Sequence, residues 1–177
     1  MSLKKLGFLS RSQLQRLHRL GSDRNAQRIL KEMEKYLFCF REKENIYYLS
    51  KEGRERVGCE VIRKKTQQVN HYLMRNDLYI FYGCPTTWKN EAKMKLKDFI
   101  IQPDAVFDKE KILHFVEVDH TQSMNVNKKK IDIYKEMYKI NSSFRLVWVT
   151  VTDFRKKKLA ELCKGLDCMV YTALDIK

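Results

Sequence analysis

The second half of the chain alternates short apolar runs with longer amphipathic runs, and this alternation constrains the fold most strongly. The runs "DFIIQPDAVFD", "KILHFVEVD", "FRLVWVTV" and "CMVYTALDI" are rich in β-branched and aromatic residues, which favour strands. Apolar residues recur at helical spacing in residues 66–83, "NVNKKKIDIYKEMYKI" and "DFRKKKLAELCKGL". An almost wholly apolar strand with a helix on either side in sequence predicts a mixed sheet covered by helices on both faces.

Residues 1–62 are organised differently. Ser10 precedes Gln13 by three residues, a capping-box spacing that predicts the start of a short helix, which we expect to end at Gly21. A second helix is expected from Ser22 or Asp23 as N-cap, with its apolar residues at Ala26, Ile29, Leu30, Met33 and Leu37. The following "LFCFREKENIYYLSKEGRERVG" predicts a β-hairpin and then a short basic helix. The order helix, helix, hairpin is typical of a winged helix-turn-helix.

Basic residues lie on the exposed side of that second helix and in the hairpin turn. Lys and Arg outnumber Asp and Glu by 36 to 22, a formal net charge of +14, and such an excess favours binding to nucleic acid. We predict that DNA is contacted by Arg24, Arg28, Lys31, Lys35 and Lys43. Two alternatives stay open: a winged helix that docks proteins with a solvated basic face, and a general lysine bias in composition.

The stretch "PDAVFDKEKILHFVEVDH" places Asp104, Glu117 and Asp119 among strand-forming residues. Side chains alternate along a strand, so Glu117 and Asp119 share a face, and pairing Asp108 with Lys111 across a two-residue turn places Asp104 beside Glu117. Burying carboxylates among apolar residues is costly unless a cation or hydrogen bonds compensate. The cluster therefore predicts either a nearby Lys or Arg or a divalent metal held by Asp104 and Glu117, with Mg²⁺ or Mn²⁺ preferred by oxygen ligands.

"PDAVF" followed by "VEVD" resembles the PD-(D/E)XK nuclease superfamily. In that superfamily an Asp and a Glu on adjacent strands hold Mg²⁺, and a Lys two residues after the Glu positions the attacking water. Asp104 and Glu117 match, but Asp119 stands where the Lys is expected. Lys130 is the candidate replacement, because "KKKIDIY" begins the next helix, although the same run suits a solvated helix start. Glu91 could add a further acidic ligand or be a surface residue.

A second resemblance covers nearly the whole chain. The predicted winged helix, Trp88 with Glu91, "PDAVF", "VEVDHT" and Lys130 with Tyr134 are similar to the plasmid replication-relaxation family of mobile elements in Gram-positive bacteria. The resemblance implies an α+β fold, with a winged-helix domain over residues 1–62 and a restriction-endonuclease-like domain, a mixed sheet flanked by helices, over residues 63–177. It also implies a role in replication or transfer of a mobile element.

Three functions remain open from the sequence. The first is a DNA-binding protein assisting replication or transfer, with a nuclease-like second domain that is not required to cleave and needs no cofactor. The second is an endonuclease or nickase dependent on Mg²⁺ or Mn²⁺. The third is a winged-helix transcriptional repressor. DNA is the expected partner, together with a relaxase or replication initiator and a second copy of the chain. Without an apolar run long enough for a membrane helix, we expect no membrane partner and a cytoplasmic location.

Overall fold

The structure is a computed structural model that describes residues 2–96 and 99–177. The chain divides into two compact units, Met1–Asn76 and Asp77–Lys177. The boundary lies later than the expected one after residue 62, because the first half of helix α5 (Val69–Phe81) packs into the N-terminal unit, where Val69 joins a core with Phe8 and Ile46. Within the described residues, no helix is both long and apolar enough to cross a membrane.

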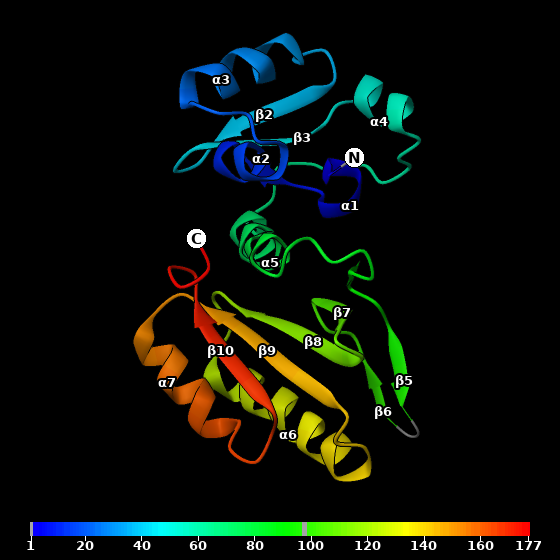
Figure 1. Ribbon diagram of the computed structural model, residues 1–177, viewed down its shortest axis with the longest axis vertical. Helices are drawn as coiled ribbons and strands as arrows, with labels where there is room; N and C mark the ends of the chain where they lie inside the picture. The colour runs from blue at the N-terminus through cyan, green and yellow to red at the C-terminus, as the bar shows by residue number, and fades with distance from the viewer. Residues whose placement is uncertain (1, 97–98) are drawn as a thin grey trace. The chain divides into compact units, whose positions relative to one another are not determined.

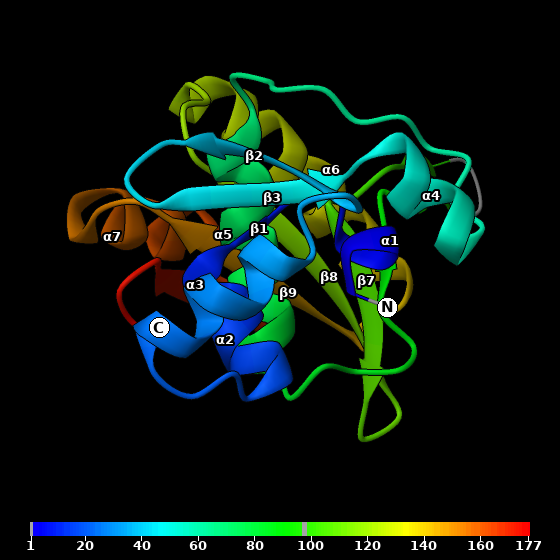
Figure 2. The ribbon, with the colours of Figure 1, turned by 90° about the horizontal axis from the view of Figure 1, so that it is seen from above.

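In its described residues, the N-terminal unit contains helices α1 to α4, the first half of α5 and a small antiparallel sheet (Figure 1). Its elements are α1 (Ser2–Leu6), β1 (Leu9–Ser10), α2 (Arg11–His18), α3 (Asp23–Glu32), β2 (Leu37–Arg41), β3 (Asn45–Leu49) and α4 (Lys51–Val57). The strand order is β1-β3-β2. Figure 2 shows β2 and β3 as a hairpin, with α4 at the end opposite its turn. The expected order of helix, helix, hairpin and short helix is therefore confirmed.

The predicted helix starts in this unit are confirmed, but the predicted ends are wrong. Ser10 and Gln13 form the capping box, and Ser22 caps α3 by accepting a hydrogen bond from the Asn25 N–H. The first helix ends before Gly21, because Arg19 adopts a left-handed conformation with φ of 51°. The second ends at Glu32, since the turn that follows releases Leu37 to pair with Leu49 in the hairpin.

The C-terminal unit is built on a five-stranded mixed sheet of order β10-β9-β8-β7-β4. Strands β8, β9 and β10 are parallel, while β7 and β4 are antiparallel to their neighbours. The elements after α5 are β4 (Lys89–Asn90), β5 (Met94–Leu96), β6 (Phe99–Ile101), β7 (Ala105–Lys109), β8 (Ile112–Asp119), α6 (Met124–Ile140), β9 (Phe144–Thr150), α7 (Asp153–Leu162) and β10 (Cys168–Thr172). The α+β class and the mixed sheet are confirmed.

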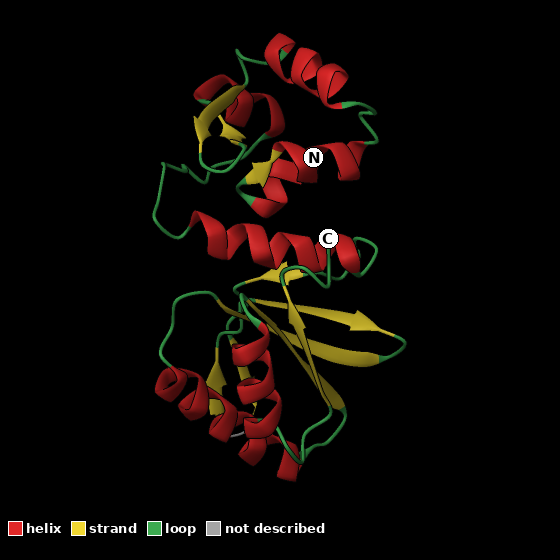
Figure 3. Ribbon diagram, turned by 90° about the vertical axis from the view of Figure 1, so that its left-hand side faces the viewer, coloured by secondary structure: helices red, strands yellow, loops and turns green. Residues whose placement is uncertain are grey.

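Helices α6 and α7 cover one face of this sheet (Figure 3). Their apolar residues pack on Phe115 and Trp148, and Trp148 is fully buried. On the other face Phe107 stacks between Trp88 and His114, with ring centroids 5.2 and 4.6 Å apart. The end of α5 continues this second layer through Tyr79, whose ring lies 5.3 Å from that of Trp88.

The predicted strand "DFIIQPDAVFD" is two strands in the structure, and its first residue, Asp98, lies outside the described residues. β6 pairs with β5, whereas β7 pairs with β8. The predicted pairing of Asp108 with Lys111 is wrong, because Glu110 and Lys111 form the turn with φ of 54° and 64° and Asp108 pairs with Leu113. In this register Asp104 precedes β7 at the level of Glu117.

Candidate functional site

Glu117 lies at the centre of the acidic cluster, which we define as Asp104, Glu117 and Asp119. Its side chain is 1% exposed on β8 and is held by two residues one turn apart on α6. The Lys130 ammonium donates to Glu117 Oε2 at 2.6 Å, and the Tyr134 hydroxyl donates to Oε1 at 2.7 Å. The predicted approach of Lys130 to Glu117 is therefore confirmed as a contact, while its catalytic role remains a prediction.

The protonation of Glu117 depends on competing neighbours. Burial first, and then the charge of Asp104, raise the pKa of Glu117 to about 8, although Lys130 and Tyr134 both favour the ionised form. The same carboxylate raises the pKa of Lys130 against the opposing effect of burial. Lys130 is therefore the charged member of this contact, and Glu117 holds a proton more tightly than an ordinary glutamate does.

Asp104 is half-buried just before β7, and its Oδ2 accepts a hydrogen bond from the Val118 N–H at 2.8 Å. This bond fixes one carboxylate oxygen against the strand that carries Glu117. Glu91 adjoins Asp104 through the main chain, where its N–H donates to the Asp104 carbonyl at 3.0 Å, but its side chain is exposed. The structure thus brings Asp104, Glu117 and Lys130 together, and Glu91 reaches them through its backbone.

Asp119 has a separate set of donors on the same side of the sheet. Its carboxylate, 0% exposed, accepts hydrogen bonds at 2.7 Å each from Asn127 Nδ2, Thr150 Oγ1 and Arg155 Nε. Burial alone would raise the pKa of Asp119, but the donors, Arg155 foremost, outweigh it and lower that pKa. Asp119 therefore ties α6 and α7 to β8 and β9. The sequence does not single out Arg155 as this partner, because it is the first of four consecutive basic residues.

The acidic cluster does not fit a resident Mg²⁺ or Mn²⁺ as it is arranged. Lys130 already occupies the side of Glu117 that a cation would need, and Arg155 neutralises Asp119. Among the residues that the structure describes, no group of three or more His, Cys, Asp or Glu side chains is placed to hold a metal ion. The Mg²⁺ or Mn²⁺ prediction stays a prediction that cleavage assays can test.

The basic side of α3 forms a second candidate site, in the N-terminal unit. All five residues predicted to contact DNA are exposed. Arg24, Arg28 and Lys31 lie on α3, whereas Lys35, predicted on the same helix, lies in the turn after its end at Glu32, and Lys43 lies in the hairpin turn. Arg28 is paired with Glu32 one turn along α3 and donates to Asn25 Oδ1 at 3.1 Å. Because both partners of this pair are about 60% exposed, water screens it and a phosphate could replace Glu32 at low cost.

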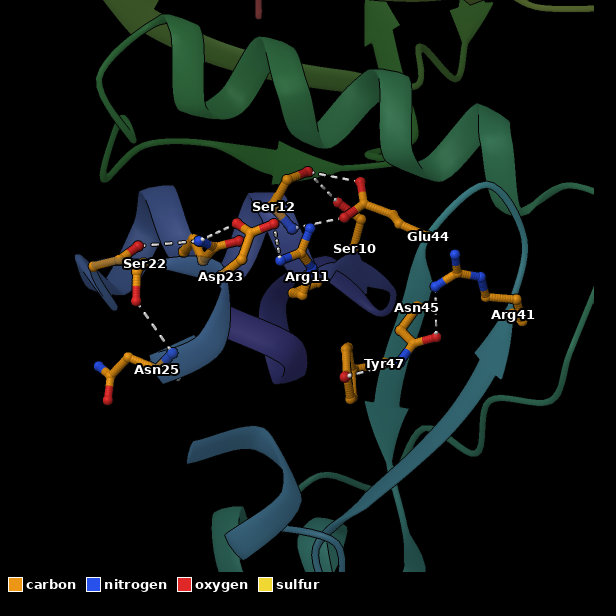
Figure 4. Close-up of polar contacts among 12 residues, drawn as sticks. Ser10, Arg11, Ser12, Ser22, Asp23, Asn25, Arg41, Glu44, Asn45 and Tyr47 are labelled. Atoms are coloured by element: carbon orange, nitrogen blue, oxygen red, sulfur yellow. Dashed lines mark hydrogen bonds and ion pairs between the residues drawn. The ribbon is translucent and has the colours of Figure 1, made fainter. Parts of the chain in front are cut away.

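Polar contacts fix the turn that leads into α3 (Figure 4). Asp23, the first residue of α3, pairs with Arg11 at the start of α2. Gln15 donates to Asp23 Oδ1 and to the Gly21 carbonyl, both at 3.0 Å. The orientation of α3 relative to α2 is thus set by side chains at both helix starts.

A further contact joins the hairpin turn to α2. Glu44 accepts a hydrogen bond from the Ser12 N–H at 2.9 Å and another from the Ser12 hydroxyl at 2.7 Å (Figure 4). A carboxylate at a helix N-terminus satisfies a backbone donor that the helix leaves unpaired. The hairpin and the two helices therefore form one braced group.

Comparison with known proteins places the chain in a family. The family model described as Replication-relaxation matches residues 1–145. The chain belongs to the replication-relaxation family. This membership confirms the resemblance found in the sequence and associates the chain with replication of a plasmid or other mobile element.

Two further comparisons add little to the family assignment. No curated protein matches the chain. Among solved structures, the protein VC1899 from Vibrio cholerae is similar with a TM-score of 0.43 and 13% sequence identity. The match covers 99% of this chain and 47% of that one, so this chain spans about half the length of that protein.

Proposed function

We propose that the protein binds DNA through its N-terminal unit and assists replication or transfer of a plasmid or other mobile element. The observation that carries the proposal is the exposed basic side of α3, presented by a braced helix–turn–helix and hairpin in a family named for replication. This unit acts as a winged helix in which α3 enters the major groove and Lys43 in the hairpin turn contacts the adjacent backbone. A relaxase or replication initiator is the proposed protein partner, and paired half-sites would suit a homodimer.

The test is a salt titration of duplex binding by fluorescence anisotropy. Arg24→Ala and Lys31→Ala should each weaken binding and reduce the magnitude of the slope of log affinity against log salt by about 0.9. The reason is that binding releases fewer counterions from the DNA when one phosphate contact is lost. Lys157→Ala on α7 is the matched control, since it removes one exposed positive charge from the other unit. Unchanged affinity and slope in both α3 variants would refute the assignment of α3 to DNA.

The second candidate function is metal-dependent DNA cleavage, and the grouping of Asp104, Glu117 and Lys130 favours it. In this function Lys130 supplies the positive charge that Asp119 cannot, and a divalent metal would supply Lewis-acid chemistry at Asp104 and Glu117. Because the cluster as arranged does not fit the metal, Lys130 would have to move from Glu117 first. We rank this function below DNA binding for that reason.

Cleavage of supercoiled and linear DNA with Mn²⁺, Mg²⁺ or EDTA separates the two functions. A nuclease would lose metal-dependent cutting in Asp104→Ala and in Lys130→Ala while both variants bind duplex normally. Equal loss of binding and cutting in Lys130→Ala would make Lys130 a phosphate contact. Tight binding with no cutting under any metal condition would leave the acidic cluster as a structural feature.

A further inference from the structure

An aromatic surface lies on the side of the hairpin away from α3. We call Phe38, Phe40, Tyr48 and Tyr72 the aromatic strip. Phe38 and Phe40 project from the same side of β2, and Phe38 pairs across the hairpin with Tyr48, their ring centroids 5.4 Å apart. The Tyr48 ring also lies 6.0 Å from that of Phe40, and Phe38 is 50% exposed. Phe40, Tyr48 and Tyr72 are half-buried, so Phe38 is the ring of the strip on which a flat group can stack most readily.

The aromatic strip packs on a buried ring of the N-terminal core. The buried ring of Phe8 lies 5.5 Å from both Tyr48 and Tyr72, which extends the run of rings onto α5. Such packing restricts rotation of Tyr48 and Tyr72, so a stacking partner finds rings already in position.

Positive charge accompanies the rings. The segment Arg63–Lys65 runs beside them, with the Lys65 ammonium 5.3 Å from the centroid of Phe40 and the Arg63 guanidinium 5.4 Å from that of Tyr72. Among the residues that the structure describes, Arg63 and Lys65 lie against rings and form no ion pair with a carboxylate, so their charge is available to phosphate. Alternating rings and cations suit a strand that has both base faces and a charged backbone.

The strip and α3 use opposite faces of the hairpin. Leu37 and Leu49 project from the other face and line a cavity of about 550 Å³ together with Ile29 and Leu30 of α3. Duplex DNA on α3 would therefore leave the strip open to a different part of the same nucleic acid. Paired bases hide their faces within the stack, so the strip can read only bases that are unpaired.

We propose that the aromatic strip binds the unpaired bases of single-stranded DNA, with Phe38 as its outer stacking residue and Arg63–Lys65 on the phosphates. The proposal deepens the proposed function, on which it rests, by naming DNA that is partly single-stranded as the substrate. Because every base can stack on an aromatic ring, the affinity should depend on whether the DNA is single-stranded and not on its sequence. The helix that binds duplex DNA and the face that binds single-stranded DNA lie on opposite sides of one hairpin. Such a protein would favour a junction between duplex and single-stranded DNA.

The experiment measures binding of the full chain to a single-stranded oligothymidine of about 16 nucleotides, the upper end of the site size for one small module. Phe38→Ala should weaken this binding by about 5-fold or more while changing affinity for a duplex of equal length by less than about twofold. Phe38→Trp should restore binding, because it restores a ring. Lys65→Gln should reduce the salt slope for the single strand by about 0.7.

Phe154→Ala is the matched control, since Phe154 is also an exposed phenylalanine, at 66%, with the Lys158 ammonium 4.5 Å from its ring centroid in the other unit. It should leave oligothymidine binding unchanged. A thermal melt of each variant confirms that it is folded.

Three results would overturn the proposal: no oligothymidine binding by the unaltered chain, equal effects of Phe38→Ala and Phe154→Ala, or equal losses for duplex and single strand in Phe38→Ala. Loss of self-association in Phe38→Ala, without a change in oligothymidine affinity, would assign the strip to a protein interface instead. Failure of the α3 variants to affect duplex binding would reject the proposed use of α3 and leave the oligothymidine result standing. The two failures are therefore distinguishable.

Discussion

Glu117→Gln should remove a pH dependence of stability from the C-terminal unit. The groups facing Glu117 are Lys130 and Tyr134 from α6 and Asp104 from the loop before β7. Burial, followed by the charge of Asp104, outweighs Lys130 and Tyr134 and raises the pKa of Glu117 from 4.5 to about 8, so the folded state binds this proton more tightly than the unfolded state does. The resulting stabilisation is fully present below the unfolded value of 4.5 and is lost as pH rises through 8.

The size of the effect follows from the two pKa values. A shift from 4.5 to about 8 corresponds at most to about 5 kcal/mol, and about 3–4 kcal/mol of it is lost between pH 5 and pH 8. A glutamine at position 117 is uncharged at every pH, and its amide can accept from Lys130 and donate to the Tyr134 hydroxyl. The variant should match the unaltered chain near pH 4 and exceed its stability by about 4 kcal/mol near pH 8.

Urea unfolding followed by tryptophan fluorescence provides the assay, because both tryptophans, Trp88 and Trp148, lie in the C-terminal unit. Other titrating groups are common to both proteins and cancel in the difference between them. Glu136→Gln is the matched control, since Glu136 is an exposed glutamate paired with Lys139 on the same helix. Parallel stability curves for the unaltered chain and Glu117→Gln would refute the reasoning and show that Glu117 stays ionised throughout.

Three other substitutions test the remaining contacts. Arg155→Met should destabilise the C-terminal unit by about 3–5 kcal/mol in urea unfolding, because it leaves a buried carboxylate without its cation. Gly53→Ala should destabilise the N-terminal unit by about 1–3 kcal/mol, seen as a lower melting temperature in circular dichroism, because the added Cβ would overlap the Tyr36 carbonyl oxygen. Glu32→Gln should raise duplex affinity about threefold in fluorescence anisotropy, since it releases Arg28 from an exposed ion pair.

Each of these substitutions has a counterpart in the same chain. Lys157→Met changes an exposed residue of the same helix as Arg155, and Glu55→Ala changes an exposed residue of the same helix as Gly53. Glu161→Gln removes an acidic partner of an exposed lysine in the other unit. If a counterpart changes stability or duplex affinity as much as its test variant does, the effect is a general response to altered charge or helix content. The role assigned to the specific contact would then be wrong.

Local signals in the sequence predicted local structure well. Ser10 with Gln13 met the geometric demands of a capping box, and that motif is present. Lys130 and Tyr134 are spaced by one helical turn, so any helix there places both on one side, where both contact Glu117. Such features can be predicted because they depend on the regular geometry of a single helix and on one nearby group that its side chains contact.

Long-range partners and unusual backbone conformations were beyond the sequence. Asp119 and Arg155 are 36 residues apart, and no spacing rule distinguishes Arg155 from the lysines that follow it. The β7–β8 turn uses Glu110 and Lys111 at positive φ, a conformation that glycine or asparagine usually marks, so the register was assigned two residues away. A cation near Asp119 could be expected on energetic grounds alone, because a carboxylate buried among apolar residues requires a compensating positive charge.

The acidic residues in a basic chain can be explained without assigning them chemistry. In the formal count of charges, Lys130 offsets Glu117 and Arg155 offsets Asp119, so these two pairs contribute nothing to the formal net charge of +14. The excess resides in other residues, which include the basic side of α3 and the segment Arg63–Lys65. Binding to DNA therefore does not depend on whether the acidic cluster cleaves it, and variants of one surface can be interpreted without assumptions about the other.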